Sequence, residues 1–463
     1  MTARHRLKLP LTRPAAVGAD LATGLLLAGK ATLFAAAPAA DQHWPQWRGP
    51  LANGVSPTAS PPLTWSETEN VKWKTTLPGR GTASPIIWGN QIFLLSAVPT
   101  GRKAETGTAE APADPPAGGP PGGRRRSEKP TEAYQFVLLC VDRDSGKLLW
   151  QKVAREEVPH EGHHPDHGFA SYSPVTDGQL VFASFGSRGL YAFDLAGNLK
   201  WQKDLGDMQT RNSFGEGSSP ALFGNTLIVN WDHEGEDFVA AFDKTTGNEL
   251  WRQARDEETS WATPLVVEHD GKPQVITSAT RKVRSYDLAT GKLLWECGGM
   301  TANVIPTPVA GHGMVYPISG FRGAALLAVR LDRTGDLTDS DAIAWRHAKG
   351  TPYVPSPLLY DDHLYFFSGN NGILSAFDAR TGRALFEAER LEALSGVYAS
   401  PVGASGRVYL VGRNGVTVVI RNSHQLEVLA TNRLEDRFDA SPALAGKDLL
   451  LRGREHLYCL AGN

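Results

Sequence analysis

The sequence is poor in cysteine, with three in 463 residues: Cys140, Cys297 and Cys459. They lie far apart, and none belongs to a Cys-x-x-Cys or Cys-x-x-Cys-His pattern, which excludes a redox pair of that type and a covalently attached haem. We expect all three to be buried as small apolar residues. The alternative is a disulfide between Cys140 and Cys459, which occupy equivalent positions in the first and last of the repeats described below.

The sequence also lacks common catalytic signatures. No Gly-x-Ser-x-Gly elbow, phosphate-binding loop or dinucleotide fingerprint stands in a strand-to-helix context, so hydrolase and nucleotide-binding functions have no support. Without residues 1–40 the chain has 42 basic and 48 acidic residues, a net charge near −6. Such a charge does not favour nucleic acid as a partner.

A long uninterrupted hydrophobic run is missing as well. The apolar stretch around Leu25-Leu26-Leu27 is interrupted by Asp20 and Lys30, which argues against a membrane span. Basic residues precede this stretch, and Ala37-Pro38-Ala39 has the small-x-small form of a cleavage site. We therefore expect residues 1–40 to be a secretory signal and the protein to be exported, to the periplasm or the cell exterior.

A Ser-Pro or Thr-Pro dipeptide is what the sequence has in abundance. It begins at Ser84, Ser173, Ser219, Thr263, Thr307, Ser356, Ser400 and Ser441. From Ser173 onward the steps are 46, 44, 44, 49, 44 and 41 residues, so a unit of about 44 residues is repeated. Each unit contains short β-rich runs separated by Gly and Asp turns, which predicts four strands.

This arithmetic predicts an all-β fold, an eight-bladed β-propeller of four-stranded blades. The first step is longer because residues 99–133, rich in Pro, Gly and Arg, form a loop in blade 1 that we expect to be disordered. The last unit has no fourth strand, and residues 70–77 are an unassigned β-rich run. We expect this run to complete the last blade and close the ring. Residues 41–64 are then a leader, and 65–463 a single propeller, which we expect to be a monomer.

The stretch from Ala241 to Trp251, Ala-x-Asp-x-x-Thr-Gly-x-x-x-Trp, has partial copies ending at Trp150, Trp295 and Phe386. It resembles the tryptophan-docking motif of quinoprotein propellers, the superfamily related to pyrroloquinoline quinone (PQQ) dehydrogenases. The resemblance implies that each Trp stacks on the Gly turn of a neighbouring blade. The opening Trp44-Pro45-Gln46-Trp47-Arg48-Gly49-Pro50 is similar to the leader of exported bacterial members. The chain lacks the enzymes' adjacent-cysteine ring and haem domain, and it is similar to the non-enzymatic propeller of the outer-membrane β-barrel assembly machinery.

In a propeller the residues before each first strand converge at one mouth of the central channel, where we expect a small polar ligand to bind. Those positions hold Arg80, Asn212, Glu216, Trp261, Asn303, Tyr353, Tyr398 and Asp439. Loops between second and third strands open on the same face, and five of them carry arginine: Arg188, Arg281, Arg322, Arg413 and Arg454. This arginine crown suits a carboxylate or phosphate, whether from a ligand or an acidic partner. The alternatives are a hydrated channel mouth and turn-stabilising surface arginines.

Two segments have the composition of metal sites. His160, His163, His164 and His167 lie within eight residues on the loop entering blade 2, as imidazoles that bind Zn²⁺ or Cu²⁺ do. The acidic turn Asp232–Asp237 in blade 3 offers oxygens for Ca²⁺. The alternatives are a structural ion or no ion for the first, and a solvated hairpin or pairing with the arginine crown for the second.

The sequence therefore predicts an exported propeller that acts as a binding scaffold, for a protein or for a small polar or anionic ligand, with no cofactor required. The alternative is a PQQ-dependent dehydrogenase that oxidises alcohols or sugars. The resemblance then implies that Glu216, Asn303 or Asp439 lies near the quinone, with Asp439 as the base and Ca²⁺ as the polarising ion.

Overall fold

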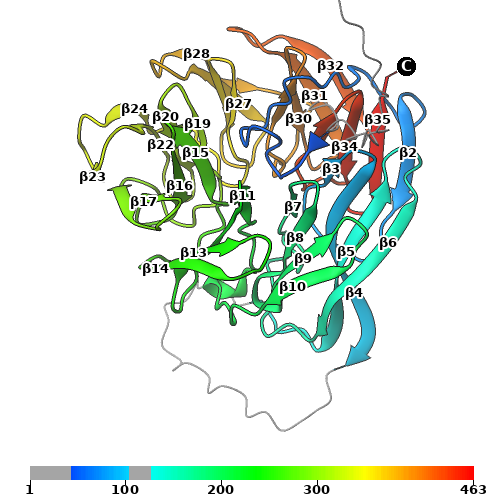
Figure 1. Cartoon of the computed structure of the whole chain (residues 1–463). Helices are drawn as coiled ribbons and strands as arrows, with labels where there is room; N and C mark the ends of the chain where they lie inside the picture. The colour runs from blue at the N-terminus through cyan, green and yellow to red at the C-terminus, as the bar shows by residue number, and fades with distance from the viewer. Residues whose placement is uncertain (1–42, 104–126, 463) are drawn as a thin grey trace, which may run out of the picture. The chain divides into compact units, whose positions relative to one another are not determined.

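The computed structural model describes residues 43–103 and 127–462, and these form an eight-bladed β-propeller. Eight antiparallel sheets carry the blades (Figure 1). The predicted signal, residues 1–40, and most of the blade 1 loop, residues 104–126, lie outside the described residues. Within the described ranges, no helix combines the length and the hydropathy that crossing a membrane requires.

The first four blades follow the predicted order of strands. Blade 1 has β3 (Ile86–Trp88), β4 (Gln91–Lys103), β5 (Glu132–Asp142) and β6 (Leu148–Glu157), with β1 (His43–Trp44) paired inside β3. Blade 2 has β7 (Val175–Thr176), β8 (Leu180–Ser184), β9 (Leu190–Asp194) and β10 (Leu199–Lys203). Blade 3 has β11 (Ala221–Phe223), β12 (Thr226–Trp231), β13 (Phe238–Asp243) and β14 (Glu249–Ala254). Blade 4 has β15 (Leu265–His269), β16 (Lys272–Ser278), β17 (Val283–Asp287) and β18 (Leu293–Cys297), with β23 (Gly335–Asp336) parallel to its outer edge. Two 3₁₀ turns, η2 (Gly186–Arg188) and η3 (Arg211–Ser213), lie near the mouth.

The other four blades complete the ring. Blade 5 has β19 (Val309–Gly311), β20 (Met314–Tyr316), β21 (Ile318–Ser319), β22 (Ala325–Arg330) and β24 (Ile343–His347). Blade 6 has β25 (Leu358–Tyr360), β26 (His363–Phe367), β27 (Ile373–Asp378) and β28 (Ala384–Arg390). Blade 7 has β29 (Val402–Ala404), β30 (Arg407–Val411), β31 (Val416–Arg421) and β32 (Val428–Arg433). Blade 8 has β33 (Ala443–Ala445), β34 (Asp448–Arg452), β35 (His456–Ala461) and β2 (Val71–Thr76).

Blade 8 confirms the predicted ring closure. Strand β2, from the beginning of the described chain, pairs antiparallel with β35 from its end, and Trp73 lies opposite Cys459. The two ends of the ring therefore share one sheet, which leaves neither β35 nor β2 without a partner.

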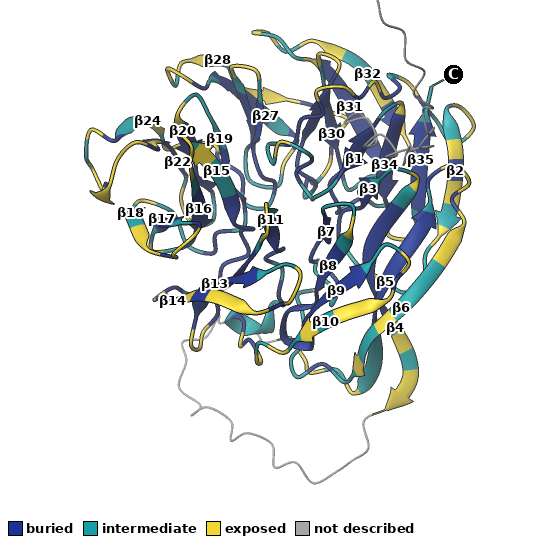
Figure 2. Cartoon of the chain, viewed as in Figure 1, coloured by how far each residue is buried: buried dark blue, intermediate teal, exposed yellow. Residues whose placement is uncertain are grey.

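In blade 3 the two middle strands are the most buried and the outer strand is the most exposed (Figure 2). The strands β12 and β13 are almost entirely buried, whereas Trp251 is the one buried residue of the outer strand β14. The inner strands are covered on both faces by neighbouring blades, which explains their continuous apolar runs.

Tryptophan docking joins most successive blades as the resemblance implied. Trp295 is an exception, because its indole N–H donates to Gln274 Oε1 of its own blade at 3.3 Å. Trp201 in blade 2 donates its indole N–H to the Lys244 carbonyl of blade 3 at 2.8 Å, and its ring covers Gly247. Gly247 has φ +70°, and a Cβ there would lie 2.7 Å from the indole, so the turn requires glycine. Asp243 caps the same turn by accepting hydrogen bonds from the backbone and hydroxyl of Thr246. The same docking joins Trp73 to Gly146, Trp150 to Gly197, Trp251 to Gly291 and Trp345 to Gly382.

The structure corrects the predicted extent of the loop in blade 1. The segment expected to be disordered, 99–133, is too wide, because β4 continues to Lys103 and β5 begins at Glu132, with Pro99 opposite Tyr134. The ends of β4 and β5 pair with each other in a hairpin, which satisfies their backbone groups outside the core. The polar composition of this segment therefore did not reveal the two strands.

The three cysteines are free and buried, as expected. The alternative disulfide between Cys140 and Cys459 is absent.

Candidate functional site

The wall of the channel is a closed ring of hydrogen bonds made by the repeated Ser/Thr-Pro dipeptides. The backbone N–H of each Ser or Thr donates to the hydroxyl oxygen of the corresponding residue in the next blade. The pairs are Ser84 to Ser173, Ser173 to Ser219, Ser219 to Thr263, Thr263 to Thr307, Thr307 to Ser356, Ser356 to Ser400, Ser400 to Ser441 and Ser441 to Ser84, all between 2.9 and 3.1 Å. The repeat therefore requires a hydroxyl at this position. The ring of eight hydrogen-bonded residues sets the width of the channel.

The leader lies against one end of this channel. Trp47 donates its indole N–H to the Ser441 hydroxyl at 3.1 Å. The buried Arg48 side chain donates to the carbonyls of Pro357 and Pro401 at 2.8 and 3.1 Å, and burial lowers its pKa to about 9. Trp47 thus forms part of the floor of the cavity that opens toward the other end, the mouth.

The main cavity occupies the channel above Trp47 and has a volume of about 410 Å³. Aromatic side chains, hydroxyls of the ring and a few titratable groups line it. They include Trp47, Phe214, Trp261, Tyr353, Tyr398, Ser84, Ser173, Ser219, Thr263, Ser400, Ser441, His164, His167, Asp166 and Asp439. Among the described residues, none of those lining it is a lysine or an arginine.

A second cavity of about 210 Å³, the arginine cavity, adjoins the first. The two share Thr82, Asp166, His167, Asp439 and Ala440 in their linings. The arginine cavity also contains four arginines, Arg80, Arg437, Arg452 and Arg454. The mouth is therefore divided into an aromatic, hydroxyl-rich part and a basic part.

Residues 158–171, the strap, connect blade 1 to blade 2 and reach across the mouth to blade 7. Asp166 on the strap accepts hydrogen bonds from Arg413 and Arg437, each at 2.8 Å, and from the Tyr398 hydroxyl at 3.2 Å. Arg413 in turn lies over the Tyr398 ring, 3.8 Å from its centroid. These contacts hold the strap against residues more than 200 positions away in the sequence.

Two groups at the junction of the cavities titrate unusually. Burial raises the pKa of Asp439 to about 6; Arg437 opposes this shift and the Asp166 carboxylate adds to it. Burial also lowers the pKa of His167 to about 4, with His163 contributing, so this imidazole is neutral at pH 7. Its Nδ1 donates to the Gly168 carbonyl at 3.0 Å, which leaves Nε2 as an acceptor.

The predicted mouth residues divide among several environments. Trp261, Tyr353, Tyr398 and Asp439 line the main cavity, while Arg80, Arg454 and again Asp439 line the arginine cavity. Asn212, Glu216 and Asn303 line neither of these cavities. Asn212 lies in η3, and Asn303 is buried with its N–H donating to the Thr280 hydroxyl. A position just before a first strand is thus not enough to place a side chain in either cavity, because the connecting loops direct some of these side chains elsewhere.

The arginine crown is not a continuous basic surface. Arg188 is buried and donates to the equally buried Glu216 at 2.6 Å, so its charge is neutralised. Arg413 forms ion pairs with Asp166 and Asp439. Arg281, Arg322 and Arg454 are exposed. The prediction of a basic crown fails for Arg188 and Arg413, because carboxylates from the connections that precede first strands pair with them.

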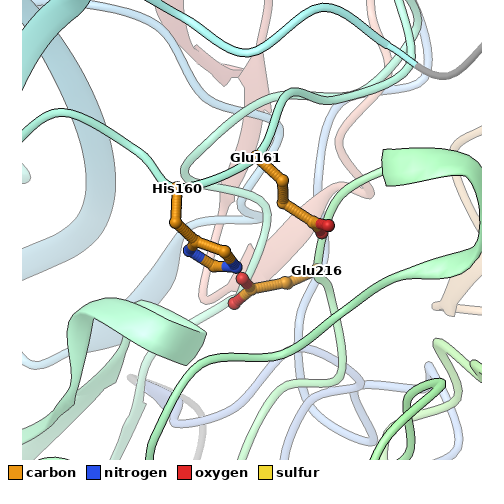
Figure 3. Close-up of side chains that lie close together, drawn as sticks. All are labelled: His160, Glu161 and Glu216. Carbon is orange, nitrogen blue, oxygen red and sulfur yellow. The ribbon is translucent and has the colours of Figure 1, made fainter. Parts of the chain in front are cut away.

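The structure does not bring the four histidines together into one cluster. Of the clusters that the described residues form, the one with metal-site geometry contains only His160, beside Glu161 and Glu216 (Figure 3). Its groups are already engaged: His160 Nε2 donates to the Met208 carbonyl at 2.6 Å, and Glu216 accepts from Arg188 and Ser187. The guanidinium of Arg188 also lies 3.4 Å from His160 Nδ1. His160 and Glu216 would have to give up these contacts to bind a cation.

The acidic turn in blade 3 is a structural element. Asp232 pairs with Arg255 at 2.6 Å, and both side chains are fully buried. Asp237 accepts from the Glu257 N–H, and Glu234 accepts from Thr259. The turn therefore pairs with an arginine, but one outside the arginine crown.

The residues suggested for a quinone and Ca²⁺ do not fit that group. Glu216 is held by Arg188 away from the main cavity, Asn303 lies outside it, and Asp439 alone lines it. Of the three residues suggested for the quinone, only Asp439 is therefore in a position to contact a ligand in the main cavity.

Several lining residues were not predicted from the sequence: Trp47, Asp166, Phe214, Arg437, Arg452 and the ring hydroxyls. His164 and His167 were predicted only as metal ligands, and both line the main cavity. The hydroxyls had a signal, since the repeat varies only between Ser and Thr before its Pro. The strap and the leader reach the mouth through connections that no periodicity encodes.

The fold and the site define the class: an eight-bladed β-propeller of the quinoprotein type whose channel is a cavity floored by its leader. The chain belongs to the family described as outer membrane protein assembly factor BamB, whose model matches residues 116–234 and 235–462. It is 23% identical over 301 residues to the outer membrane protein assembly factor BamB of Shewanella oneidensis. That match covers 61% of this chain and 66% of the relative, just under two thirds of the relative's length.

Solved structures share the fold. BamB from Moraxella catarrhalis superposes with a TM-score of 0.50 at 14% identity, over 71% of this chain and 94% of that one. The quinohemoprotein alcohol dehydrogenase from Comamonas testosteroni superposes with a TM-score of 0.58 at 10% identity, over 92% and 81%. These comparisons confirm the predicted resemblance, which at such identities extends to the fold alone.

Proposed function

We propose that the protein is an exported binding scaffold that holds a protein partner on the mouth face of the propeller, within an outer-membrane protein assembly system. The observation that carries the proposal is membership of the BamB family together with a closed, rigid ring. The relative is named an outer membrane protein assembly factor, and a scaffold needs a binding surface rather than a catalytic centre.

The exposed arginines of the mouth face support an acidic partner surface. Arg281 and Arg322 lie on hairpins between second and third strands and line neither cavity. The side chain of Arg281 is 56% exposed, and its ion pair with Asp256 at 3.7 Å is solvated, so both arginines are available to a partner. Rim arginines of this kind speed association and make it sensitive to salt.

The test is site-specific photo-crosslinking in cells that produce the protein. A photoreactive residue is placed at Arg281 and Arg322 on the mouth face, and at Arg380 in a turn on the opposite face. We expect the two mouth positions to link to one acidic protein of an outer-membrane assembly complex and Arg380 not to link to it.

Charge reversal provides the second arm. With the identified partner purified, Arg281→Glu combined with Arg322→Glu should weaken binding at least about tenfold, while the control Arg380→Glu leaves it unchanged. Links formed equally from both faces, or an unchanged affinity in the double variant, would contradict the proposal.

A further inference from the structure

We propose that the main cavity and the arginine cavity together form a binding site for a small anionic carbohydrate, a sugar ring that carries one carboxylate or phosphate group. The inference is independent of the proposed protein partner, because it rests on residues inside the channel mouth. Three features of the two cavities carry it: their continuity, the chemistry of the main cavity and the charge of the arginine cavity.

The cavities are continuous and of suitable size. Five residues line both, among them Asp166, His167 and Asp439, so one ligand can occupy the two at once. A volume of about 410 Å³ for the main cavity is within the range of small-molecule sites. The floor formed by Trp47 gives the ligand a single side of entry, from the mouth.

Aromatic walls suit the C–H faces of a sugar ring. Trp261 and Tyr353 both line the main cavity, and neither indole nor phenol needs to move to present its ring. Trp261 is fixed by its N–H, which donates to the Gly215 carbonyl at 2.7 Å, and Tyr353 stacks on Phe321 with ring centroids 4.8 Å apart. Rings that are held in this way lose little entropy when a ligand packs on them.

The polar groups of the main cavity match hydroxyls, which both donate and accept. In the Ser/Thr ring each hydroxyl oxygen accepts a backbone N–H, so its own proton remains to be donated; Ser84, Ser173 and Ser219 are three of those in the lining. Asp439 and the neutral His167 are acceptors in the same lining. An apolar ligand would leave these groups without partners, at a cost in affinity.

The arginine cavity supplies the site for the negative group. It contains four arginines against two aspartates, Asp166 and Asp439. Arg80 and Arg454 are exposed, and none of the ion pairs among the described residues involves either one. Arginine forks hold carboxylate and phosphate oxygens in paired hydrogen bonds. Arg80 and Arg454 both line the arginine cavity, into which a substituent of a ring bound in the main cavity would extend.

The experiment is calorimetric titration of the full chain with four probes: glucuronate, glucose 6-phosphate, glucose and inorganic phosphate. We expect at least one anionic sugar to bind in the submillimolar range and at least about tenfold more tightly than glucose or phosphate. Preference between glucuronate and glucose 6-phosphate identifies a uronic acid or a phosphorylated sugar as the source. Absence of binding by both, or equal binding by phosphate or glucose alone, would overturn the inference.

Variants locate the binding. Arg80→Ala combined with Arg454→Ala should reduce the affinity for the anionic sugar to that for glucose, and Tyr353→Ala should weaken both sugars. Arg390→Ala, on the outer strand β28, is the matched control and should change neither. All these side chains are exposed or half-buried, and unchanged thermal melting confirms that each variant folds. Equal effects of the control and the double variant would overturn the inference, whatever the outcome of crosslinking through Arg281 and Arg322.

Discussion

The backbone N–H of Ser441 donates a hydrogen bond to the hydroxyl of Ser84 at 2.9 Å, across 357 residues of sequence. This bond completes the ring around the channel, so blade 8 meets blade 1 by the same contact that joins every other pair of blades. The repeated hydroxyl is therefore both the structural fastening of the propeller and a lining group of its main cavity.

Removing one hydroxyl from the ring tests this arrangement. Ser84→Ala leaves the buried N–H of Ser441 without an acceptor and should lower the free energy of unfolding by about 1–3 kcal/mol. Ser84→Thr keeps the hydroxyl and should cost much less, since Thr263 and Thr307 occupy equivalent positions. Urea unfolding measures both, and equal losses in the two variants would show that the hydroxyl has no special role.

Tryptophan docking makes a second stability prediction. Gly247→Ala places a Cβ 2.7 Å from the Trp201 ring and imposes φ +70° on alanine. Gly224→Ala is the control, because Gly224 has φ +57° and open space around its Cβ position. The control should lose only the backbone strain, about 1–2 kcal/mol, and Gly247→Ala clearly more. If thermal unfolding shifts equally for both, the indole does not hold the neighbouring blade.

The contacts of Asp166 predict local dynamics at the mouth. Asp166→Asn removes the charge that Arg413 and Arg437 share, and the strap should open more often. Backbone hydrogen exchange in residues 158–171 should increase about tenfold, as expected for the loss of a hydrogen bond to a charged group. Exchange elsewhere should not change, and Asp341→Asn, at a fully solvated position, is the control. Unaltered exchange in the strap would show that other contacts hold it.

Asp439 predicts a pH dependence with a defined sign. Because burial raises its pKa to about 6, the folded state takes up a proton at a pH where the unfolded carboxyl, with a pKa near 3.9, does not. The contribution of Asp439 to stability is therefore largest below about pH 4 and falls as the pH rises to 6. Relative to Asp439→Asn, the native protein should lose roughly 2 kcal/mol across this window.

The comparison between the native protein and Asp439→Asn is essential, because His167 makes the stability change with pH in the opposite direction. Its lowered pKa, about 4, makes the folded state less stable as the pH falls below 6.5, but this effect is common to both proteins and cancels. The measurement is urea unfolding at several pH values between 4 and 7. Parallel curves would mean that Asp439 titrates normally.

Much of the fold follows from the sequence because it is encoded locally and repeated. The Ser/Thr-Pro period, the Gly and Asp turns and the β-rich run at residues 70–77 each depend on short-range backbone preferences. They predicted eight four-stranded blades and the pairing of β2 with β35, as observed. Tryptophan docking followed from a motif of eleven residues.

The site depends on contacts that no local pattern encodes. The sequence placed Glu216 at the mouth, but the arginine beside it in space, Arg188, holds it in a buried pair. It grouped four histidines by proximity along the chain, while the strap points their rings toward different partners such as Met208, His164 and Gly168.

The sequence by itself thus determined the number of blades and the closure of the ring, because both follow from a repeated local preference. Only the tertiary structure decided which side chains face the channel. The leader, which contains Trp47, and the strap, which contains Asp166, determine which side chains line the cavity. Their positions are set by electrostatic and packing contacts between residues hundreds of positions apart in the sequence.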